Sequence, residues 1–485
     1  MGDHRSQSFW RAVLGGALAG LAPASAGPLL MIPSLALLWS IANRPRLAAI
    51  WGLLAVLVSH RWLLALHPLT WMGVPAALSL PIAAAIWLFC ALCGSALLAV
   101  WSALSRWLDA TKQNAGLWTV LLLASIWGLA EVGLASMPLF WLGIGGSVLP
   151  FDPALAGLSR WIGNGGLAAL QLVLAWGLWI GLSHRRGLLW GLLWLLSVLL
   201  VHLLGAASLQ WVSPSQAELH LAAWQPVIPT REKFSLEQQR QLPDLVQAAL
   251  HRADSLSVEA LVAPEGLLPS NWRGAFRDQP ISLITGGFRW DVSEQRSSLL
   301  LIEPDALKPQ PLRDKHRLVP LGEALPPLPS GWISGLSAVG GLRPGSASRF
   351  VDGFEPPIAI AICYEISDGR ALAQATAAGA QWLLTIANLD PYPVLLQKQF
   401  LALAQLRAIE TGRDLLSVAN TGPTALIGAQ GRVMPLIPPG QEGVAKAVVH
   451  LRSGLTPYVR WAEWPLIVLL AAAWIGLLRS SAHQS

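Results

Sequence analysis

Three separate segments in the C-terminal half of the chain hold residue types that together could carry out covalent acyl transfer. Glu265 follows a short apolar run, Lys315 lies in a charged segment, and Cys363 ends another apolar run, with spacings of 50 and then 48 residues (315 − 265 and 363 − 315). Covalent acyl transfer requires a nucleophile, a base and a group that stabilises negative charge. The chain therefore has the parts of such a site, provided that folding brings them together.

The three residue types have complementary chemical roles. An ordinary thiol is mostly protonated at neutral pH, so a cysteine nucleophile needs a neighbour that takes its proton. Glu265 is the candidate base, and Lys315 is the candidate cation that stabilises the developing negative charges. Each residue alone also has an ordinary structural interpretation, as a packed cysteine, a strand-end carboxylate or an exposed lysine. The prediction of an active site depends on all three converging.

The other two cysteines, Cys90 and Cys93, lie inside an apolar run without a second Cys/His pair to complete a metal site. A zinc site or a disulfide framework would need more ligands or more cysteines. We expect these two residues to be small packing residues. Cys363 is the one thiol in the charged half of the chain.

The segments around the candidate residues have the length of buried strands and alternate with helical stretches. Short apolar runs lie at 219–223, 258–263, 281–285, 298–302, 358–363, 382–387, 415–419 and 424–427. Helical stretches are predicted at 235–253, 368–379 and 397–411. This alternation predicts one α/β sandwich-type domain that delivers the candidate residues at strand or loop ends. The Pro-rich segment 304–329 is predicted to be an irregular loop.

The N-terminal part is apolar enough to cross a membrane several times. The chain is 54% hydrophobic and 12% charged, about half the charge of an ordinary soluble protein, which excludes a fully water-solvated or disordered chain. Stretches that approach the ~20 apolar residues of a spanning helix lie near 9–26, 28–42, 47–66, 76–105, 117–137, 164–183, 187–207 and 463–478. We predict a membrane domain of about seven helices over 1–207, an extramembrane domain over 208–460, and a last helix with a tail over 461–485.

The basic residues of the loops predict the orientation of the chain. With the N-terminus inside, Arg160 is the one basic residue of the short outside loops. The cytoplasmic side then holds Arg5, Arg11, Arg44, Arg46, Arg106, Lys112, Arg185, Arg186 and Arg479. Because positive charges prefer the cytoplasmic side, residues 208–460 are expected to face the periplasm or its equivalent.

The net charge of +6 does not indicate a nucleic-acid surface. Residues 1–207 hold ten Lys/Arg and four Asp/Glu, which leaves 23 of each for the rest of the chain (33 − 10 and 27 − 4). A nucleic-acid surface would need basic residues clustered on a folded domain. Three ionisable residues at membrane depth, His60, Arg61 and Glu131, are expected to have either structural partners or a role in lipid handling.

The segments around the three candidates read Pro264-Glu265, Lys315-His-Arg-Leu-Val-Pro-Leu-Gly-Glu323 and Ile362-Cys363-Tyr364-Glu365-Ile366. In this order and spacing they resemble the signature segments of the nitrilase (carbon–nitrogen hydrolase) superfamily. The exact residues of these segments, together with the membrane spans on both sides of them, resemble one branch of the superfamily, the apolipoprotein N-acyltransferases. Also similar to this branch are Leu406 to Arg413, Ala419 to Gly422, Glu131 and Pro153-Ala-Leu-Ala-Gly-Leu. The resemblance implies an α-helical polytopic membrane domain joined to an extracytoplasmic nitrilase-like α-β-β-α sandwich.

The resemblance also implies a mechanism and partners. Cys363, activated by Glu265, would attack the sn-1 ester of a phospholipid and hold the acyl chain as a thioester, while Lys315 stabilises the tetrahedral intermediate. The α-amino group of an apolipoprotein's diacylglyceryl-cysteine would then accept the chain. No metal, nucleotide or other cofactor is implied, and the protein would be a monomer of the bacterial inner membrane. The positions that the family uses as supports correspond to Glu323, Tyr364 and Glu365.

The chain departs from the family's pattern at two places. Phe234, a candidate substrate-binding residue, stands where the family usually has a tryptophan, and Asn388-Leu-Asp390-Pro-Tyr392 replaces the usual Asn-Asp-x-Trp-Phe. Both segments keep an aromatic residue. We expect the changes to affect donor preference and lid geometry, and to leave the three catalytic candidates unchanged.

Two other functions fit parts of the sequence. A membrane-tethered nitrilase or amidase would use the same three residues and give the acyl group to water, although it would have no need of so many spans. A non-catalytic membrane transporter or scaffold with a binding domain would draw support from Arg61 and Glu131. The intact set of Glu265, Lys315 and Cys363 argues against this second alternative.

Overall fold

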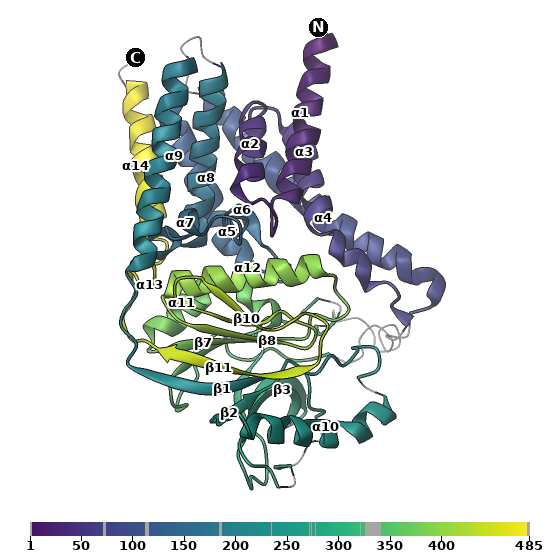
Figure 1. The fold of residues 1–485 in the computed structure, drawn as a ribbon. Coiled ribbons are helices and arrows are strands. Elements are labelled where there is room, and N and C mark those ends of the chain that lie inside the picture. Colours follow the sequence, from purple (N-terminus) through teal and green to yellow (C-terminus); the bar gives the residue numbers. More distant parts are fainter. Residues whose placement is uncertain are drawn as a thin grey trace.

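The computed structural model describes residues 2–70, 74–111, 116–183, 187–233, 235–270, 272, 274–276, 278–320, 322–324 and 341–482. The apolar stretches predicted in the N-terminal part and near the C-terminus are helical (Figure 1). These helices are α1 (Gly2–Leu21), α2 (Pro28–Trp39), α3 (Pro45–Ser59), α4 (Ala76–Thr111), α5 (Gly116–Ser136), α8 (Ser159–Ser183), α9 (Gly187–Gln210) and α14 (Trp464–Ala482). Short helices lie between them: η1 (Arg61–Leu66), α6 (Gly143–Gly146) and α7 (Pro153–Ala156).

Among the described residues, four helices are long and apolar enough to cross a membrane. They cover 76–108, 116–136, 159–183 and 188–210. α2, α3 and α14 are apolar but shorter. The stretch predicted at 47–66 is divided, because α3 ends at Ser59 and a 3-10 helix follows. Of the basic residues used to predict orientation, Lys112, Arg185 and Arg186 lie outside the described residues.

Small residues allow the helices of the bundle to come close together. A Cβ atom at Gly128 of α5 would lie 2.4 Å from the main-chain oxygen of Gly165 in α8, and a Cβ at Gly165 would lie 2.5 Å from the oxygen of Gly128. No side chain fits at this crossing, so the two backbones are in direct contact. α14 packs against both helices, which joins the end of the chain to the bundle.

Two β-sheets form the second half of the molecule. The first sheet has the order β11-β1-β2-β3-β4-β5, and the second has the order β10-β9-β8-β7-β6. The strands of the first sheet are β1 (Ala217–Gln225), β2 (Ala260–Val262), β3 (Ser282–Asp291), β4 (Glu294–Ile302), β5 (Gln310–Asp314) and β11 (Gly443–Leu451). Those of the second are β6 (Ile358–Ile362), β7 (Trp382–Ala387), β8 (Leu415–Ala419), β9 (Thr424–Ile427) and β10 (Val433–Ile437).

Helices cover the outer face of each sheet, so the domain is the α-β-β-α sandwich that was expected. Residues such as Leu221 and Val262 of the first sheet pack between the sheets against Ile360 and Leu384 of the second. α10 (Leu236–Asp254) covers the first sheet, and α11 (Gly369–Ala377) and α12 (Val394–Thr411) cover the second (Figure 1). β6, β7 and β8 are parallel and buried on both faces, which explains why their sequences are apolar except at Thr385 and Ser417.

The sandwich is inserted between two helices of the bundle. α9 leads into β1, and β11 leads through α13 (Pro457–Trp461) into α14 (Figure 1). α12 lies between the second sheet and the bundle, where Ala402, Leu406 and Ile409 are buried against Val148 and Leu167. One helix of the sandwich therefore forms much of the contact between the two halves.

Three strands lie outside the apolar runs that predicted the others. β5 falls within 304–329, so the prediction of an irregular loop is wrong for residues 310–314. Pro311 is tolerated there because β5 is an edge strand, where a missing N–H group costs no hydrogen bond within the sheet. β10 and β11 are also edge strands.

Candidate active site

The three predicted catalytic residues come within three residues of the end of a strand. Glu265 follows β2 by three residues, Lys315 is the first residue after β5, and Cys363 is the first residue after β6. Cys363 begins a 3-10 helix, η3 (Cys363–Ser367), and is not the last residue of the strand as the apolar run predicts. Although the strands belong to two sheets, the folded chain brings the three side chains together.

Lys315 lies between two carboxylates. Its Nζ donates to Glu265 Oε1 at 2.7 Å and to Glu323 Oε1 at 2.8 Å, and its side chain is 1% exposed. The lysine's main-chain N–H donates to Ser297 O at 2.8 Å. Burial acts to lower the pKa of Lys315, but the two carboxylates outweigh it and hold that pKa well above its ordinary value. Lys315 is therefore a fixed cation.

Glu265 is held by groups on both of its carboxylate oxygens. Oε1 accepts from Lys315, and Oε2 accepts from the main-chain N–H of Asn388 at 3.2 Å. The main-chain carbonyl of Glu265 accepts from Lys233 Nζ at 3.1 Å. Burial lowers the pKa of Lys233 to about 8, against the opposing charges of Glu265 and Asp390. The carboxylate of Glu265 is thus fixed in position, and a second lysine, Lys233, holds the main chain of the same residue.

Cys363 is partly exposed, and the charges of Glu265, Lys315 and Glu323 act on its thiol. Desolvation raises the pKa of Cys363 well above its ordinary value, and the negative charge of Glu265 raises it further, while Lys315 opposes both. The thiol is therefore protonated at rest and needs a base at the moment of attack. Cys363 also has a φ of 57°, an unfavourable backbone conformation for a residue with a side chain, of the kind found at functional sites.

The predicted supporting residues fix the loops that carry the lysine and the cysteine. Glu323 accepts from Lys315 through one oxygen and from Val319 N at 2.9 Å through the other. Burial raises the pKa of Glu323, and Lys315 opposes this rise. The Tyr364 hydroxyl donates to Leu318 O at 2.8 Å, and its ring centroid lies 5.8 Å from Lys315 Nζ. Both residues hold the 315–323 segment against the site.

Glu365 joins the lysine loop to the cysteine turn. One oxygen accepts from the main-chain N–H groups of His316 at 2.7 Å and Arg317 at 3.1 Å. The other accepts from Ile362 N at 2.8 Å and from Arg349 Nη1 at 2.7 Å. Since His316 follows Lys315 and Ile362 precedes Cys363, this buried carboxylate fixes the distance between the two catalytic candidates.

The segment that departs from the family's pattern contacts the site through its backbone. Besides the bond from Asn388 to Glu265, Asp390 Oδ2 accepts from Thr230 N at 2.7 Å. The Tyr392 ring packs edge-on against Trp62 of η1, with centroids 5.4 Å apart. Burial raises the pKa of Tyr392, with further contributions from Cys363 and Glu323. The other departure, Phe234, lies outside the described residues.

Three basic residues of the site are not predicted from the sequence: Lys233, Arg317 and Arg349. Their partners are distant in the chain or are main-chain atoms, so no short spacing indicates them. Of the three, Arg317 does lie inside the charged segment that holds Lys315, but the sequence gives it no role of its own. Its buried contacts with the membrane helices depend on the fold. In the described part of the chain, no group of His, Cys, Asp and Glu residues is arranged to hold a metal ion.

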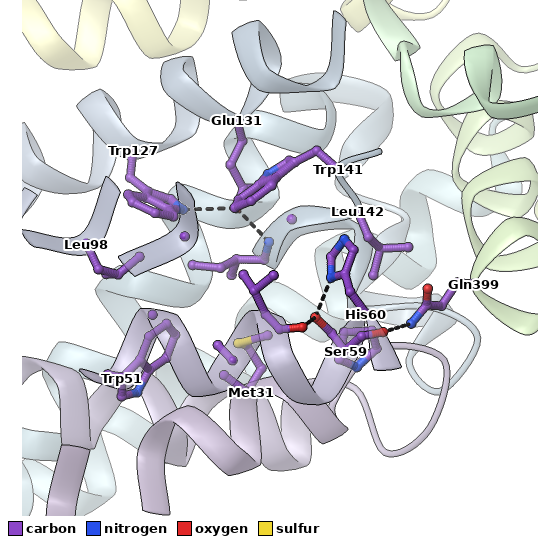
Figure 2. Close-up of a pocket in the computed structure, with 18 residues that line it drawn as sticks. Met31, Trp51, Ser59, His60, Leu98, Trp127, Glu131, Trp141, Leu142 and Gln399 are labelled. Carbon is purple, nitrogen blue, oxygen red and sulfur yellow. Dashed lines mark hydrogen bonds between the residues drawn. The ribbon is translucent and has the colours of Figure 1, made fainter. Parts of the chain in front are cut away.

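Figure 2 shows a small cavity, about 70 Å³, inside the helical bundle, with Glu131 at its wall. The Glu131 carboxylate accepts from Trp127 Nε1 at 2.9 Å and from the main-chain N–H groups of Ile144 at 2.6 Å and Gly145 at 3.1 Å. The two main-chain donors lie in the first turn of α6, where N–H groups have no partner within the helix, and Trp127 belongs to α5. Of the two roles expected for Glu131, its contacts therefore favour structural pairing.

The neighbouring His60 also has protein partners. Its Nδ1 lies 2.8 Å from Ser59 Oγ, and its Nε2 lies 3.3 Å from Phe140 O. Gln399 of α12 donates to Ser59 O at 3.1 Å, so the sandwich reaches the edge of the cavity (Figure 2). Arg61 is exposed, and its Nη1 donates to Val58 O at 2.7 Å.

Comparisons with known proteins show what this chain is similar to. The sequence model of the carbon–nitrogen hydrolase family matches residues 246–454. A protein of Parasynechococcus marenigrum named apolipoprotein N-acyltransferase is 62% identical over 95% of this chain and 99% of its own length. One of the same name from Prochlorococcus marinus is 55% identical over 98% and 97%. The crystal structure of Nit3 from Saccharomyces cerevisiae, a nitrilase superfamily member, covers 49% of this chain and 91% of its own, with 12% identity and a TM-score of 0.37.

Sequence identity at this level over nearly the whole length extends to both the helical bundle and the sandwich. The protein is thus a membrane-associated acyltransferase with a nitrilase-like domain. The chain belongs to the apolipoprotein N-acyltransferase family.

Proposed function

We propose that this acyltransferase moves an acyl chain from a phospholipid to Cys363, and from the resulting thioester to the α-amino group of a diacylglyceryl-cysteine at the N-terminus of an apolipoprotein. Glu265, Lys315 and Cys363 are the catalytic residues of this proposal. The observation that carries it is the position of Lys315, which bonds Glu265 at 2.7 Å and Glu323 at 2.8 Å next to the thiol.

In the first half-reaction, Glu265 takes the proton from Cys363 Sγ as the sulfur attacks the sn-1 ester carbonyl. A carbon–sulfur bond forms, and the negative charge that develops on the carbonyl oxygen is stabilised by Lys315. Collapse breaks the ester bond, and the proton held by Glu265 passes to the departing alkoxide of the lysophospholipid. The raised pKa of Cys363 supports this concerted role of the base, since no free thiolate is present beforehand.

In the second half-reaction, the α-amino group of the acceptor attacks the thioester carbonyl. Glu265 takes a proton from the nitrogen as the carbon–nitrogen bond forms, the carbon–sulfur bond breaks, and Cys363 regains its proton. An amide replaces a thioester, so the products are the N-acylated lipoprotein and the resting enzyme. Both half-reactions use one site in turn, as expected for a covalent acyl-enzyme.

We also propose a monomer of the bacterial inner membrane whose residues 208–460 face the periplasm. The proposal divides the chain into a membrane domain of about seven spans over 1–207, the catalytic domain, and a last span with a tail over 461–485. Its supports are the insertion of the sandwich between α9 and α14 and the basic residues of the N-terminal loops. Such an attachment holds the site at the surface of the bilayer that contains both lipid substrates.

The mechanism is tested by intact-mass analysis of the purified protein after incubation with phospholipid. Wild type is expected to gain one acyl mass, which hydroxylamine removes, and Cys363→Ala is expected to gain none. Addition of a diacylated lipopeptide to the acylated protein then distinguishes a transferase from a hydrolase. A transferase moves the acyl chain to the amine of the peptide, whereas a hydrolase releases it as free fatty acid. Absence of the adduct with every phospholipid tried contradicts the proposal.

Orientation is tested with green fluorescent protein fused after Ser485, because this reporter becomes fluorescent in the cytoplasm and remains dark when exported to the periplasm. Fluorescence is expected. A dark fusion would contradict the proposed topology. So would protection of residues 208–460 from a protease that is added on the periplasmic side.

A further inference from the structure

Arg317 connects the active site to the end of a membrane helix. It lies two residues after Lys315, is 7% exposed, and its Nη2 donates to Met137 O at 2.6 Å, just beyond the end of α5. Its Nη1 donates to Ser367 Oγ at 2.8 Å and to Tyr364 O at 3.3 Å. The guanidinium of Arg317, which belongs to the lysine loop, therefore contacts both the cysteine turn and the residue that follows α5.

A second bond joins the same elements. Ser367, the last residue of η3, donates through its hydroxyl to Ala135 O at 3.0 Å. The carbonyls of Ala135 and Met137 lie at the C-terminal end of α5, where helix carbonyls lack partners within the helix and where a positive charge is favourable. Arg317 and Ser367 thus cap α5 with groups that belong to the catalytic domain.

The Arg317 guanidinium also determines where the cysteine turn lies. Its central carbon is 4.4 Å from the centroid of the Tyr364 ring, a distance typical of a cation–π contact. Tyr364 is the residue after Cys363 in the chain, and its hydroxyl donates a hydrogen bond to Leu318 O of the lysine loop. A displacement of the guanidinium therefore moves the thiol relative to Lys315.

We propose that Arg317 is a positioning residue that transmits the location of the α5 terminus to the pair formed by Lys315 and Cys363. The membrane domain is then a structural component of the active site in addition to being an anchor. This inference rests on the proposed function and adds to it a residue that acts through Tyr364 and Ser367. A small change in nucleophile position has a large effect on rate, because reacting atoms must be closely aligned.

The test compares Arg317→Met, Arg317→Lys and the control Arg343→Gln in the full chain in detergent. Arg343 is an exposed arginine of the same domain whose nearest carboxylate oxygen, on Glu294, is 3.7 Å away. Single-turnover acylation by phospholipid is expected to slow about tenfold or more in Arg317→Met, with the lipid concentration at half-maximal rate unchanged. Arg317→Lys is expected to recover part of the rate, because lysine keeps the charge and loses the two-pronged geometry.

Two further measurements keep the test decisive. The pH profile of Cys363 alkylation, which needs no substrate, is expected to move by about half a pH unit or more in Arg317→Met and to stay fixed in Arg343→Gln. The double variant Ser367→Ala/Arg317→Met is expected to slow acylation by less than the product of the two single effects. The reason is that both side chains hold the same contact with the end of α5.

The outcomes separate this inference from the proposed function. An unchanged rate and alkylation profile in a folded Arg317→Met, a loss seen only in the half-saturating lipid concentration, or full additivity with Ser367→Ala would each overturn the positioning role. If wild type forms no acyl adduct, the proposed function fails, and the alkylation profile alone still decides the role of Arg317. If Arg317→Met does not fold, Arg317→Lys and Ser367→Ala carry the comparison.

Discussion

Lys315 is a buried cation whose charge is balanced by two carboxylates that come from different segments of the chain. A buried ion pair adds little net stability compared with apolar packing, but the loss of one partner leaves an uncompensated buried charge. The arrangement therefore makes the lysine difficult to replace. The two carboxylates also hold the pKa of Lys315 well above its ordinary value, so the lysine carries its positive charge beside the thiol at neutral pH.

Replacing Lys315 by methionine is expected to slow acylation of Cys363 by about 100-fold or more, since one electrostatic stabiliser of the transition state is removed. The variant also leaves Glu265 and Glu323 facing each other, so its melting temperature should fall. The control is Lys308→Met, an exposed lysine of the same domain. Single-turnover mass analysis measures the rate, and a Lys315→Met rate within tenfold of wild type would argue against the role of this cation.

The thiol offers a pH-dependent readout. Because the negative charge of Glu265 raises the pKa of Cys363, Glu265→Gln should lower that pKa and move iodoacetamide alkylation to lower pH, even though acyl transfer is expected to be lost. A background without Cys90 and Cys93 isolates the signal. Glu303→Gln, an exposed carboxylate, is the control. A profile that stays fixed or moves to higher pH would show that Glu265 does not act on the thiol.

At the scale of helices and strands, the sequence is most informative where burial is complete. The parallel strands β6, β7 and β8 are buried on both faces and have largely apolar sequences, so their positions are predicted correctly. β5 contains Gln310, Pro311 and Arg313 and has one partner strand, so neither an apolar run nor a strict alternation marks it. Edge strands take their conformation from the neighbour, and that neighbour is known only from the fold.

The same reasoning explains what could be foreseen of the site. Glu265, Lys315 and Cys363 stand out because their residue types suit covalent chemistry and each follows a strand or enters a charged segment. Arg349 could not be foreseen, because its partner Glu365 becomes a neighbour only when the loop before β6 folds back onto η3. Lys233 is bound through a main-chain carbonyl, which any residue would provide. Contacts of this kind leave no pattern in the sequence.

The crossing of α5 and α8 gives a prediction for the helical bundle. Gly128→Leu places a side chain where a Cβ already lies 2.4 Å from the Gly165 oxygen, so the helices must separate. The melting temperature in detergent is expected to fall by about 5 °C or more. Gly133→Leu lies on the same helix with nothing within 4 Å of its Cβ and should leave the melting temperature unchanged. Equal effects of the two substitutions would contradict the close contact.

At the scale of the whole molecule, α12 packs against both the second sheet and the helical bundle. Its Phe400, Ala404 and Ala408 belong to the cluster that contains Leu383 and Leu415 of the second sheet, and its Leu406 and Ile409 pack toward the membrane helices. A helix that is apolar on opposite faces is suited to burial between two bodies, which accounts for the buried state of nearly its whole length. The two halves are therefore parts of one packed structure.

A fragment of residues 208–460 is expected to aggregate without detergent, because removing the bundle exposes the outer face of α12 and the carbonyl contacts of Arg317 and Ser367 are lost. Its Cys363 should form no acyl adduct under conditions in which the full chain does. Size-exclusion chromatography and intact mass measure both properties. A monodisperse, acylated fragment would mean that the membrane helices serve only as an anchor.

The pairing of β1 with β11 has a consequence for how the protein is made. β1 is complete once Gln225 has been synthesised, but its neighbour on one side is not complete until Leu451, near the end of translation. Throughout that interval the β1 edge presents unpaired N–H and C=O groups, while α14, which packs against α5 and α8, has not yet been synthesised. A chain that ends before the last strand therefore has an open sheet edge beside β1 and lacks the contacts of α14 with the bundle.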